Sequence, residues 1–250
     1  MLEVRALSKN FGGVKAVKEL DLAVNAGDIF GVIGPNGSGK STLVNLISGV
    51  FSATSGDILF QGQSLSRLSP HARVRMGVAR TFQNIRLFPG LTVWQNLWVA
   101  RNSAEDIRAE GVSYRWFRKG GPVKKEIDNM LEFSGLADKG DELASNLAFG
   151  EQRRLELARA AATKPRLLIL DEPAAGMNQD EIRDLDWRIR QLRQQGMTII
   201  LIEHVMDLVM GITDRIAVLN FGSKIAEGEP AAIQENKSVQ EAYLGQSKDD

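Results

Sequence analysis

The sequence predicts an α/β fold in which helices cover both faces of a mainly parallel sheet. Four short, continuous apolar segments have the length of buried strands: 29–33, 167–170, 198–202 and 216–219. Two segments between them, 179–195 and 205–210, space their apolar residues as helices do. Because fully apolar strands that alternate with helices are typical of buried parallel sheets, we expect a parallel sheet here.

Two further regions depart from this alternation. Strand-like segments at 2–7, 14–24 and 56–60 are separated by glycine turns, whereas residues 91–145 place apolar residues at helical spacing. The second region is interpreted as an inserted helical lobe, in which Trp94 and Trp98 serve packing rather than docking. We expect an exposed loop at 115–122, which is basic, aromatic and rich in helix breakers, and a disordered tail at 246–250.

The charge balance and the lengths of the apolar segments bear on which classes of function are possible. Lys plus Arg equals Asp plus Glu at 31 each, so no overall positive charge marks a nucleic-acid binder. No stretch approaches the ~18 to 20 uncharged apolar residues of a membrane span, and any membrane role is expected to come through a partner chain. No secretory signal is recognised at the start, which predicts a cytosolic protein.

The strongest motif follows the segment 29–33. It reads Gly34-Pro35-Asn36-Gly37-Ser38-Gly39-Lys40-Ser41-Thr42, which is the G-x-x-x-x-G-K-[ST] phosphate-binding loop. Glycines let backbone N–H groups turn toward the phosphates, Lys40 reaches the β- and γ-phosphate oxygens, and the Ser41 hydroxyl is placed to bind Mg²⁺. Apolar residues at helical spacing follow, so a helix N-terminus faces the anion. The loop predicts binding of ATP with Mg²⁺.

A second element is the apolar segment 167–170, which ends in Asp171 and Glu172. Asp171 is expected beside the metal ion and Glu172 beside the attacking water. Two acidic residues after a strand can also mark nothing more than the strand's end. The decision between these interpretations depends on a third motif.

That motif is Leu147-Ala148-Phe149-Gly150-Glu151-Gln152-Arg153-Arg154, which resembles the L-S-G-G-Q-x-x-R signature of ATP-binding cassette (ABC) ATPases. The resemblance extends over essentially the whole chain. It matches Phe11 to the aromatic residue that stacks on adenine, Gln83 to the glutamine of the lid loop, residues 175–178 to the D-loop, and His204 to the switch histidine.

The resemblance implies the details of fold and site. The fold would be a P-loop NTPase (RecA-like) core with an antiparallel β subdomain and an inserted helical subdomain, all within residues 1–245. The core would comprise 1–83 and 160–245, and the helical subdomain 84–159. Phe11, residues 34–42 and Gln83 would bind ATP, and Glu172 and His204 would be catalytic.

Mg²⁺ would lie near Ser41, Gln83 and Asp171. A helix beginning near Gly150 would bring its N–H groups to the nucleotide of a second copy, through the signature residues Leu147, Ala148, Phe149, Gly150 and Glu151. Three positions depart from the family pattern: Ala148 replaces Ser, Phe149 replaces Gly, and Asn178 replaces the usual Asp. A working ATPase is expected despite them.

Four segments, 79–83, 146–154, 172–178 and 202–206, resemble the ATP-binding subunit of branched-chain amino acid importers, a group in which those departures are typical. The resemblance implies permease chains in the inner membrane, a second ABC ATPase chain, a periplasmic solute-binding protein, and a peripheral place on the membrane's cytoplasmic side. Nucleic acid is not expected as a partner. A permease helix is expected to dock beside residues 84–98.

Three alternatives remain. A lipid or lipopolysaccharide exporter cassette carries similar signatures. A soluble ABC ATPase acting on DNA or ribosomes usually has two cassettes or a long coiled coil, and this sequence shows one cassette and no extended heptads. A P-loop kinase or GTPase has no use for residues 147–154. His71 is expected to be an exposed residue at a helix start rather than a ligand.

Overall fold

A computed structural model describes residues 1–101 and 122–244 of the 250-residue chain. The chain divides into two compact units, Met1–Arg80 with Arg166–Asp250, and Thr81–Pro165. The loop expected at 115–122 lies outside the described residues except for Pro122, which begins a helix, α6. Proline is accommodated in a first helical turn because its missing N–H has no intrahelical partner there. The tail expected at 246–250 also lies outside them.

The first unit contains a six-stranded sheet in the order β10-β9-β3-β8-β7-β6. Its strands are β3 (Ile29–Ile33), β6 (Val78–Arg80), β7 (Leu167–Asp171), β8 (Thr198–Ile202), β9 (Arg215–Asn220) and β10 (Ser223–Gly228). The pairings of β3, β6, β7, β8 and β9 are parallel, and β10 joins β9 antiparallel. Every residue of β3, β7 and β8 is buried, which explains their continuous apolar sequences and confirms the predicted parallel sheet.

A second, antiparallel sheet of the same unit has the order β2-β1-β4-β5. Its strands are β1 (Leu2–Phe11), β2 (Val14–Val24), β4 (Ser55–Phe60) and β5 (Gln63–Ser64). β1 continues four residues beyond the predicted segment 2–7, because irregular pairing with β2 persists to Phe11 opposite Val14. This extension carries Phe11 to the turn between the two strands.

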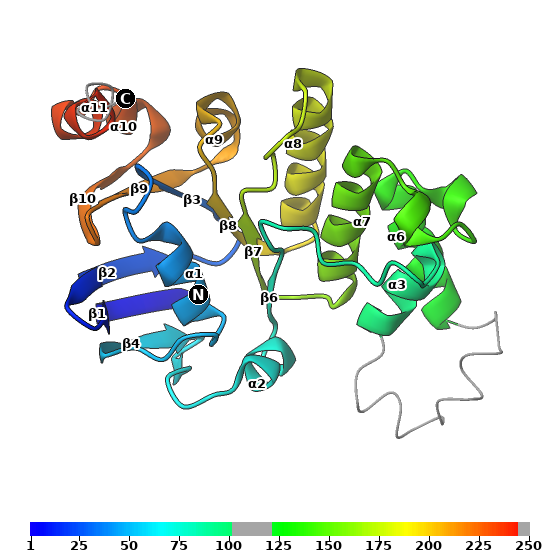
Figure 1. Cartoon of the computed structure of the whole chain (residues 1–250), viewed down its shortest axis with the longest axis horizontal. Coiled ribbons are helices and arrows are strands. Elements are labelled where there is room, and N and C mark those ends of the chain that lie inside the picture. Colours follow the sequence, from blue (N-terminus) through cyan, green and yellow to red (C-terminus); the bar gives the residue numbers. More distant parts are fainter. Residues whose placement is uncertain (102–121, 245–250) are drawn as a thin grey trace. The chain divides into compact units, whose positions relative to one another are not determined.

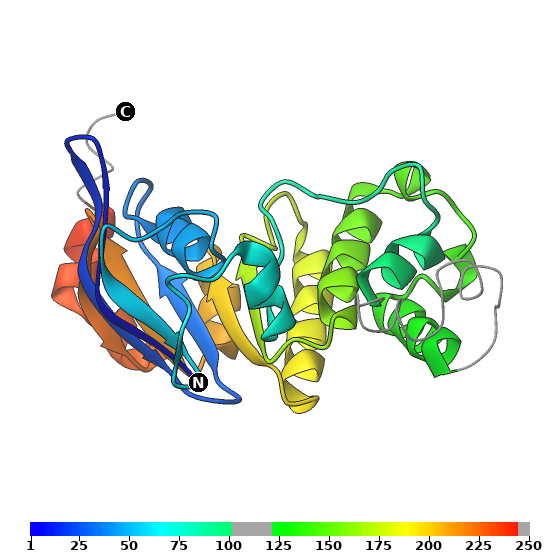
Figure 2. The same cartoon turned by 90° about the horizontal axis from the view of Figure 1, so that it is seen from below.

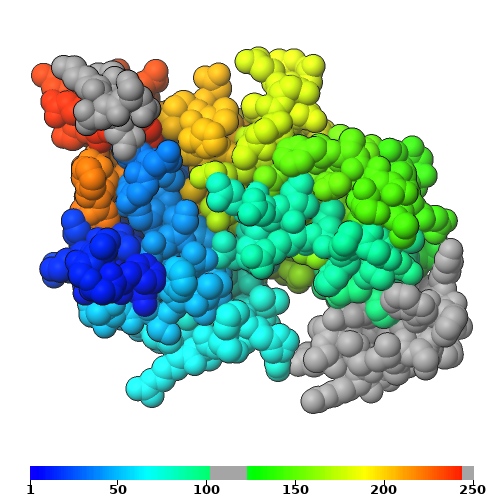
Figure 3. All heavy atoms as spheres, in the orientation of Figure 1, coloured from blue at the N-terminus to red at the C-terminus, as the bar shows by residue number. Residues whose placement is uncertain are grey.

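Six helices accompany these sheets in the described part of the first unit: α1 (Lys40–Ile47), α2 (Pro70–Arg75), α8 (Gln179–Gln194), α9 (Met206–Ile212), α10 (Pro230–Gln234) and α11 (Lys237–Leu244). α1 contributes Leu43, Val44, Leu46 and Ile47 to a core that also includes strands of both sheets. Figures 1 and 2 show the α1 ribbon next to these sheets. β10 and β2 lie side by side where the two sheets meet, seen as neighbouring orange and blue atoms in Figure 3. The P-loop helix is therefore held between two sheets.

The second unit is helical within its described residues. It contains α3 (Val93–Arg101), α6 (Pro122–Ser134), α7 (Phe149–Ala162) and two single 3-10 turns, η1 (Ala137–Lys139) and η2 (Ala144–Asn146). Trp98 is buried in its core with residues of α6 and α7, and the half-buried Trp94 packs against that core. The packing role predicted for both tryptophans is confirmed. None of the helices within residues 1–101 and 122–244 combines the length and apolar character needed to cross a membrane.

Candidate functional site

The predicted phosphate loop joins β3 to α1. Gly34, Gly37 and Gly39 have φ of 150°, 75° and 107°, a region that side chains disfavour. A Cβ at Gly34 would overlap the carbonyl oxygen of Leu219, and one at Gly39 would lie 2.6 Å from that of Ala16. Among the described residues, no side chain caps the N-terminus of α1, whose N-cap residue is Gly39. The backbone donors at this end are thus left available for an anion.

Two side chains of this loop, those of Lys40 and Ser38, are buried. Lys40 is only 8% exposed, and its Nζ donates to the carbonyl oxygens of Gly34 at 2.6 Å and Pro35 at 3.0 Å. Burial lowers the pKa of Lys40, while the carboxylates of Glu172 and Asp171 oppose that change. Ser38 Oγ is buried without a hydrogen-bond partner in the part of the chain that the structure describes. An orphaned hydroxyl, a buried ammonium group and an open helix end together fit a polyphosphate.

The predicted metal-binding acid, Asp171, ends β7 and is buried. Arg80, on the neighbouring β6, donates from Nη2 to Asp171 Oδ2 at 3.1 Å. Arg80 also reaches α1, through Asn45 Oδ1 at 2.7 Å and Ser48 Oγ at 3.0 Å. Burial raises the pKa of Asp171, and the Arg80 charge counteracts this. Arg80 therefore connects the acid to the P-loop helix, a role that sequence reasoning missed.

The donor set at this site suits magnesium. A hydroxyl at Ser41 and a carboxylate at Asp171 are hard oxygen donors, and Mg²⁺ keeps several waters and takes phosphate oxygens as further ligands. Within residues 1–101 and 122–244, no group of three or more His, Cys, Asp or Glu side chains could hold a metal ion by itself. A metal ion that arrives with a nucleotide fits this arrangement.

The two predicted catalytic residues follow neighbouring parallel strands. Glu172 comes directly after β7 and His204 lies two residues after β8. Glu172 has φ of 48°, and its N–H donates to the carbonyl oxygen of Ile202 at 2.9 Å. The His204 side chain is 62% exposed. Both lie at the carboxyl edge of the parallel sheet, where ligands of open α/β sheets bind.

The predicted adenine contact, Phe11, is 42% exposed beside the turn between β1 and β2. Its ring meets Phe51 edge to face at 5.2 Å, and Lys9 Nζ lies 4.9 Å from its centroid. These neighbours hold the ring while leaving part of it accessible to a base. The adenine contact of Phe11 stays a prediction, and sequence reasoning named neither Phe51 nor Lys9 as its neighbours.

In the second unit, α7 joins the signature residues to the lid loop. Arg153 donates from Nη2 to the carbonyl oxygen of Gln83 at 2.6 Å and from Nη1 to that of Phe82 at 3.1 Å. Gln83 itself is exposed. The signature residues 147–151 and Gln83 are therefore parts of one connected arrangement, which Arg153 holds together.

The N-terminus of α7 carries the departures from the family pattern. Ala148 is its N-cap residue and supplies no side-chain cap, and Phe149 is exposed. Glu151 Oε2 accepts from the Ala148 N–H at 3.0 Å, while Glu151 Oε1 pairs with Lys139 at 2.9 Å. The third departure, Asn178, is the N-cap of α8 in the first unit.

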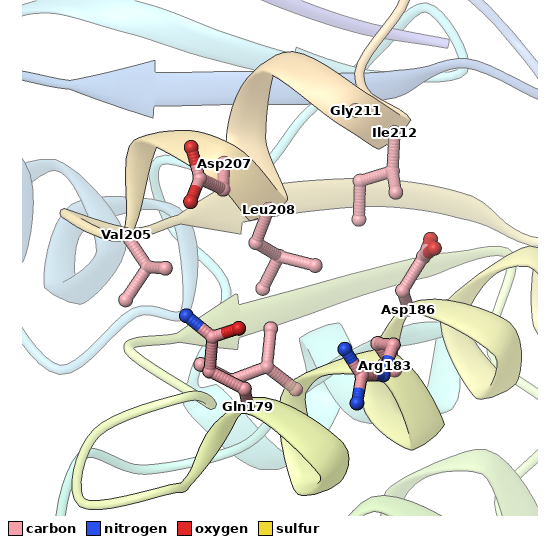
Figure 4. A pocket seen from close by; sticks show the side chains of 9 residues that line it. Gln179, Arg183, Asp186, Val205, Asp207, Leu208, Gly211 and Ile212 are labelled. Atoms are coloured by element: carbon pink, nitrogen blue, oxygen red, sulfur yellow. The ribbon is translucent and has the colours of Figure 1, made fainter.

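A groove of about 210 Å³ lies between α8 and α9 (Figure 4). Leu208 and Ile212 contribute apolar surface, and Arg183 and Asp186 lie on its α8 side. None of the predicted nucleotide-binding residues lines this groove.

His71, expected at a helix start, is exposed in the first turn of α2 and accepts a hydrogen bond from Arg75.

Comparisons with known proteins give the family. A family model described as "ABC transporter" matches residues 17–175, and one described as "Branched-chain amino acid ATP-binding cassette transporter" matches residues 223–249. The chain is 43% identical over 251 residues to a "High-affinity branched-chain amino acid transport ATP-binding protein LivG" of Escherichia coli K12, covering 99% of this chain and 98% of that protein. It is 42% identical, with the same coverage, to the BraF protein of Pseudomonas aeruginosa.

Solved structures agree. The ADP conformation of MJ1267, an ATP-binding cassette of an ABC transporter, matches with a TM-score of 0.86 and 31% identity over 98% of both chains. A nucleotide-free cassette from an ABC transporter matches with a TM-score of 0.84 and 30% identity, over 97% of this chain and 98% of that one. These matches confirm the predicted ABC ATPase fold. The chain belongs to the ABC transporter family, as an ATP-binding ATPase subunit.

Proposed function

We propose that this chain hydrolyses ATP to power import of branched-chain or related amino acids through a separate membrane permease. The observation that carries the proposal is the buried Lys40 ammonium, folded across the P-loop beside the charges of Asp171 and Glu172. The amino-acid substrate is supported by the names of the relatives and by the second family match, at residues 223–249. The exporter and nucleic-acid alternatives are not favoured by these relatives.

The residues act on ATP in distinct ways. Phe11 presents a ring face to adenine, while the N-terminal N–H groups of α1 and the Lys40 ammonium bind the phosphates. Mg²⁺, bound with the nucleotide through Ser41, Asp171 and Gln83, would neutralise phosphate charge. Glu172 polarises the attacking water, and His204 donates a hydrogen bond to the γ-phosphate as charge develops.

A second ABC ATPase chain completes the site. One P-loop leaves the outer side of the γ-phosphate exposed to water, and the open N-terminus of α7 from a second copy would supply donors there. In this arrangement two chains share two nucleotides. Closing with ATP and reopening after hydrolysis gives the motion that a permease can use.

The permease contact is assigned to the segment between Asn84 and Trp98, in the second unit. Arg86 and Phe88 are both exposed there. The Arg86 guanidinium lies 4.4 Å from the Phe82 ring centroid, one residue before Gln83. A charged rim with an exposed aromatic residue suits a partner helix, and the proposed role of the neighbouring Gln83 as a Mg²⁺ ligand would couple this contact to nucleotide binding. The chain would act at the cytoplasmic face of the inner membrane, fed by a periplasmic solute-binding protein.

The test is leucine uptake by proteoliposomes that contain this chain and the permease chains that co-purify with it, with a solute-binding protein added to the outside. We expect uptake that depends on internal ATP and ATP hydrolysis that rises when leucine-loaded binding protein is present. Leucine that neither accumulates nor stimulates hydrolysis, in vesicles where the purified chain still hydrolyses ATP, would contradict amino-acid import and leave the ATPase assignment standing.

Arg86→Glu separates coupling from chemistry in the same vesicles. The substitution reverses an exposed charge at the assigned contact while keeping the backbone N–H that donates to Glu156 at 3.1 Å. We expect uptake to fall on the order of tenfold, while hydrolysis by the isolated chain stays within about twofold. Arg67→Glu, on an exposed residue of the first unit, is the matched control. Loss of basal hydrolysis in Arg86→Glu would place this segment in the catalytic site instead.

A further inference from the structure

A buried acid next to the switch histidine has no assigned role. The Glu203 side chain is 0% exposed and accepts three backbone hydrogen bonds. Its Oε1 accepts from the N–H of Ala174 at 2.7 Å, and its Oε2 accepts from those of His204 at 2.9 Å and Val205 at 3.2 Å. The first donor belongs to the loop after Glu172, and the other two belong to the loop that carries His204.

The loop after β7 also needs external support. Glu172 has φ of 48°, a left-handed conformation that residues other than glycine rarely adopt. Such a conformation persists where surrounding contacts over-determine it. The contacts here are the Glu172 N–H to the Ile202 carbonyl oxygen at 2.9 Å and the Ala174 N–H to Glu203. Both attach the Glu172 loop to the end of β8.

We propose that Glu203 is a positioning residue that ties the Glu172 loop to the His204 loop. The tie keeps a constant separation between the carboxylate that polarises water and the imidazole that contacts the γ-phosphate. The effect of this tie on catalysis rests on the proposed ATP hydrolysis, whereas the hydrogen-bonded connection between the two loops does not. Glu203 makes its three hydrogen bonds to these two loops and contacts neither nucleotide nor water itself in this assignment.

The chemistry of a carboxylate explains why an acid stands here. An ionised carboxylate accepts hydrogen bonds on both oxygens, so one side chain can serve two loops at once. An amide of the same shape accepts on one end only and would turn its NH₂ group toward an N–H donor at the other end. One loop would then lose its tie, and a buried N–H would lose its partner.

Glu203→Gln in the full-length chain tests both parts. Amide hydrogen exchange, resolved by residue, should accelerate at least tenfold for Ala174 or for the pair His204 and Val205. The Leu43 N–H of α1, bonded to Gly39 at 2.9 Å, should exchange as before. The kcat for ATP should fall on the order of 10- to 100-fold, because sub-ångström positioning is lost. The Kd of a fluorescent ATP analogue without metal should change less than twofold.

Two further variants complete the design. Glu203→Asp keeps both oxygens and the charge but shortens the side chain by one methylene. It should therefore lose its hydrogen bonding to one of the two loops and lower kcat as Glu203→Gln does. It carries the test if Glu203→Gln does not fold. Asp207→Asn removes a charge from an exposed residue four positions on and should leave exchange and kcat unchanged.

Three results would overturn the proposal. Unchanged exchange at Ala174, His204 and Val205 would show that no tie exists. If Glu203→Gln exchanges these amides faster but has the same kcat as the control Asp207→Asn, the tie exists and has no catalytic use. Loss of ATP affinity in parallel with kcat, with faster exchange across α1, would show a general structural role. If the unsubstituted chain hydrolyses no ATP, the proposed function fails, while the exchange result still decides the tie.

Discussion

The N-termini of α1 and α7 contrast with that of α8. α1 and α7 begin at Gly39 and Ala148, neither of which caps its helix with a side-chain acceptor, although Glu151 accepts from the Ala148 N–H at 3.0 Å. α8 begins at Asn178, whose Oδ1 accepts from the N–H groups of Asp180 at 2.9 Å and Glu181 at 3.0 Å. Glu181 in turn accepts from the Asn178 N–H at 2.9 Å. The N-cap side chain of α8 thus satisfies donors of its first turn, whereas the N-cap residues of α1 and α7 offer no side-chain acceptor to theirs.

The contrast supports the proposed phosphate sites at α1 and α7. A helix end that is closed by its own side chains has no donors left for an anion, whereas an open end attracts one through its N–H groups and dipole. α7 is the less open of the two, because Glu151 lies in its first turn. Lys139 pairs with Glu151 and lowers the pKa of that carboxyl below its usual range. The Lys139 charge thus offsets an acid that would repel phosphate.

Lys40→Ala removes the cation at the more open end and has the largest expected effect. A hydrogen bond to a charged group contributes about 1.5 to 3 kcal/mol, so ATP affinity should fall about 10- to 100-fold. Equilibrium titration with a fluorescent ATP analogue measures the change. Lys237→Ala, at an exposed lysine in the same unit, is the control. Equal affinity in the two variants would mean that the open end of α1 is not the phosphate site.

Asn178→Ala opens the closed end. Loss of an N-cap costs about 0.5 to 2 kcal/mol of unfolding free energy, so the denaturation midpoint should fall while ATP affinity stays within about twofold. Urea unfolding with and without nucleotide measures both quantities. Asn178→Asp keeps the acceptor and should retain stability. If Asn178→Ala binds ATP much more weakly with its stability intact, the α8 end is not merely a closed cap.

Ala148→Ser closes the α7 end in part and has the smallest expected effect. The new oxygen can accept from the first turn, which should stabilise the protein by about 0.5 to 1 kcal/mol. The same hydroxyl can donate to a phosphate of the second copy, so dimerisation should occur at a lower ATP concentration. Thermal unfolding and light scattering across an ATP titration report the two effects. Stabilisation with weaker dimerisation would show that a capped α7 no longer offers its donors.

Much of the fold was predictable because its signals are local. β3, β7 and β8 are continuous apolar segments, and α8 repeats apolar residues at helical spacing. β10, α10 and α11 were missed. β10 is a half-buried strand paired with β9 alone, and α10 and α11 have five and eight residues, too few for a clear period.

The candidate site divides in the same way. Its phosphate loop, paired acids and signature are short motifs, whereas the residues that hold them act over long sequence separations. Arg80 reaches Asp171 across 91 residues, Arg153 reaches Gln83 across 70, and Glu203 is reached by Ala174 across 29. A single sequence shows residue types and local spacing, so such contacts became evident only in the folded chain.

The shared nucleotide site is best tested by the mass of the Glu172→Gln variant with Mg²⁺ and ATP, determined by light scattering after gel filtration. Loss of the water-polarising carboxylate should slow hydrolysis on the order of 10² to 10⁴ and leave both open helix ends intact. We predict a monomer without nucleotide and a stable dimer with ATP, in which α7 of each copy faces the nucleotide of the other. A variant that binds ATP at saturation and remains a monomer would contradict the shared site.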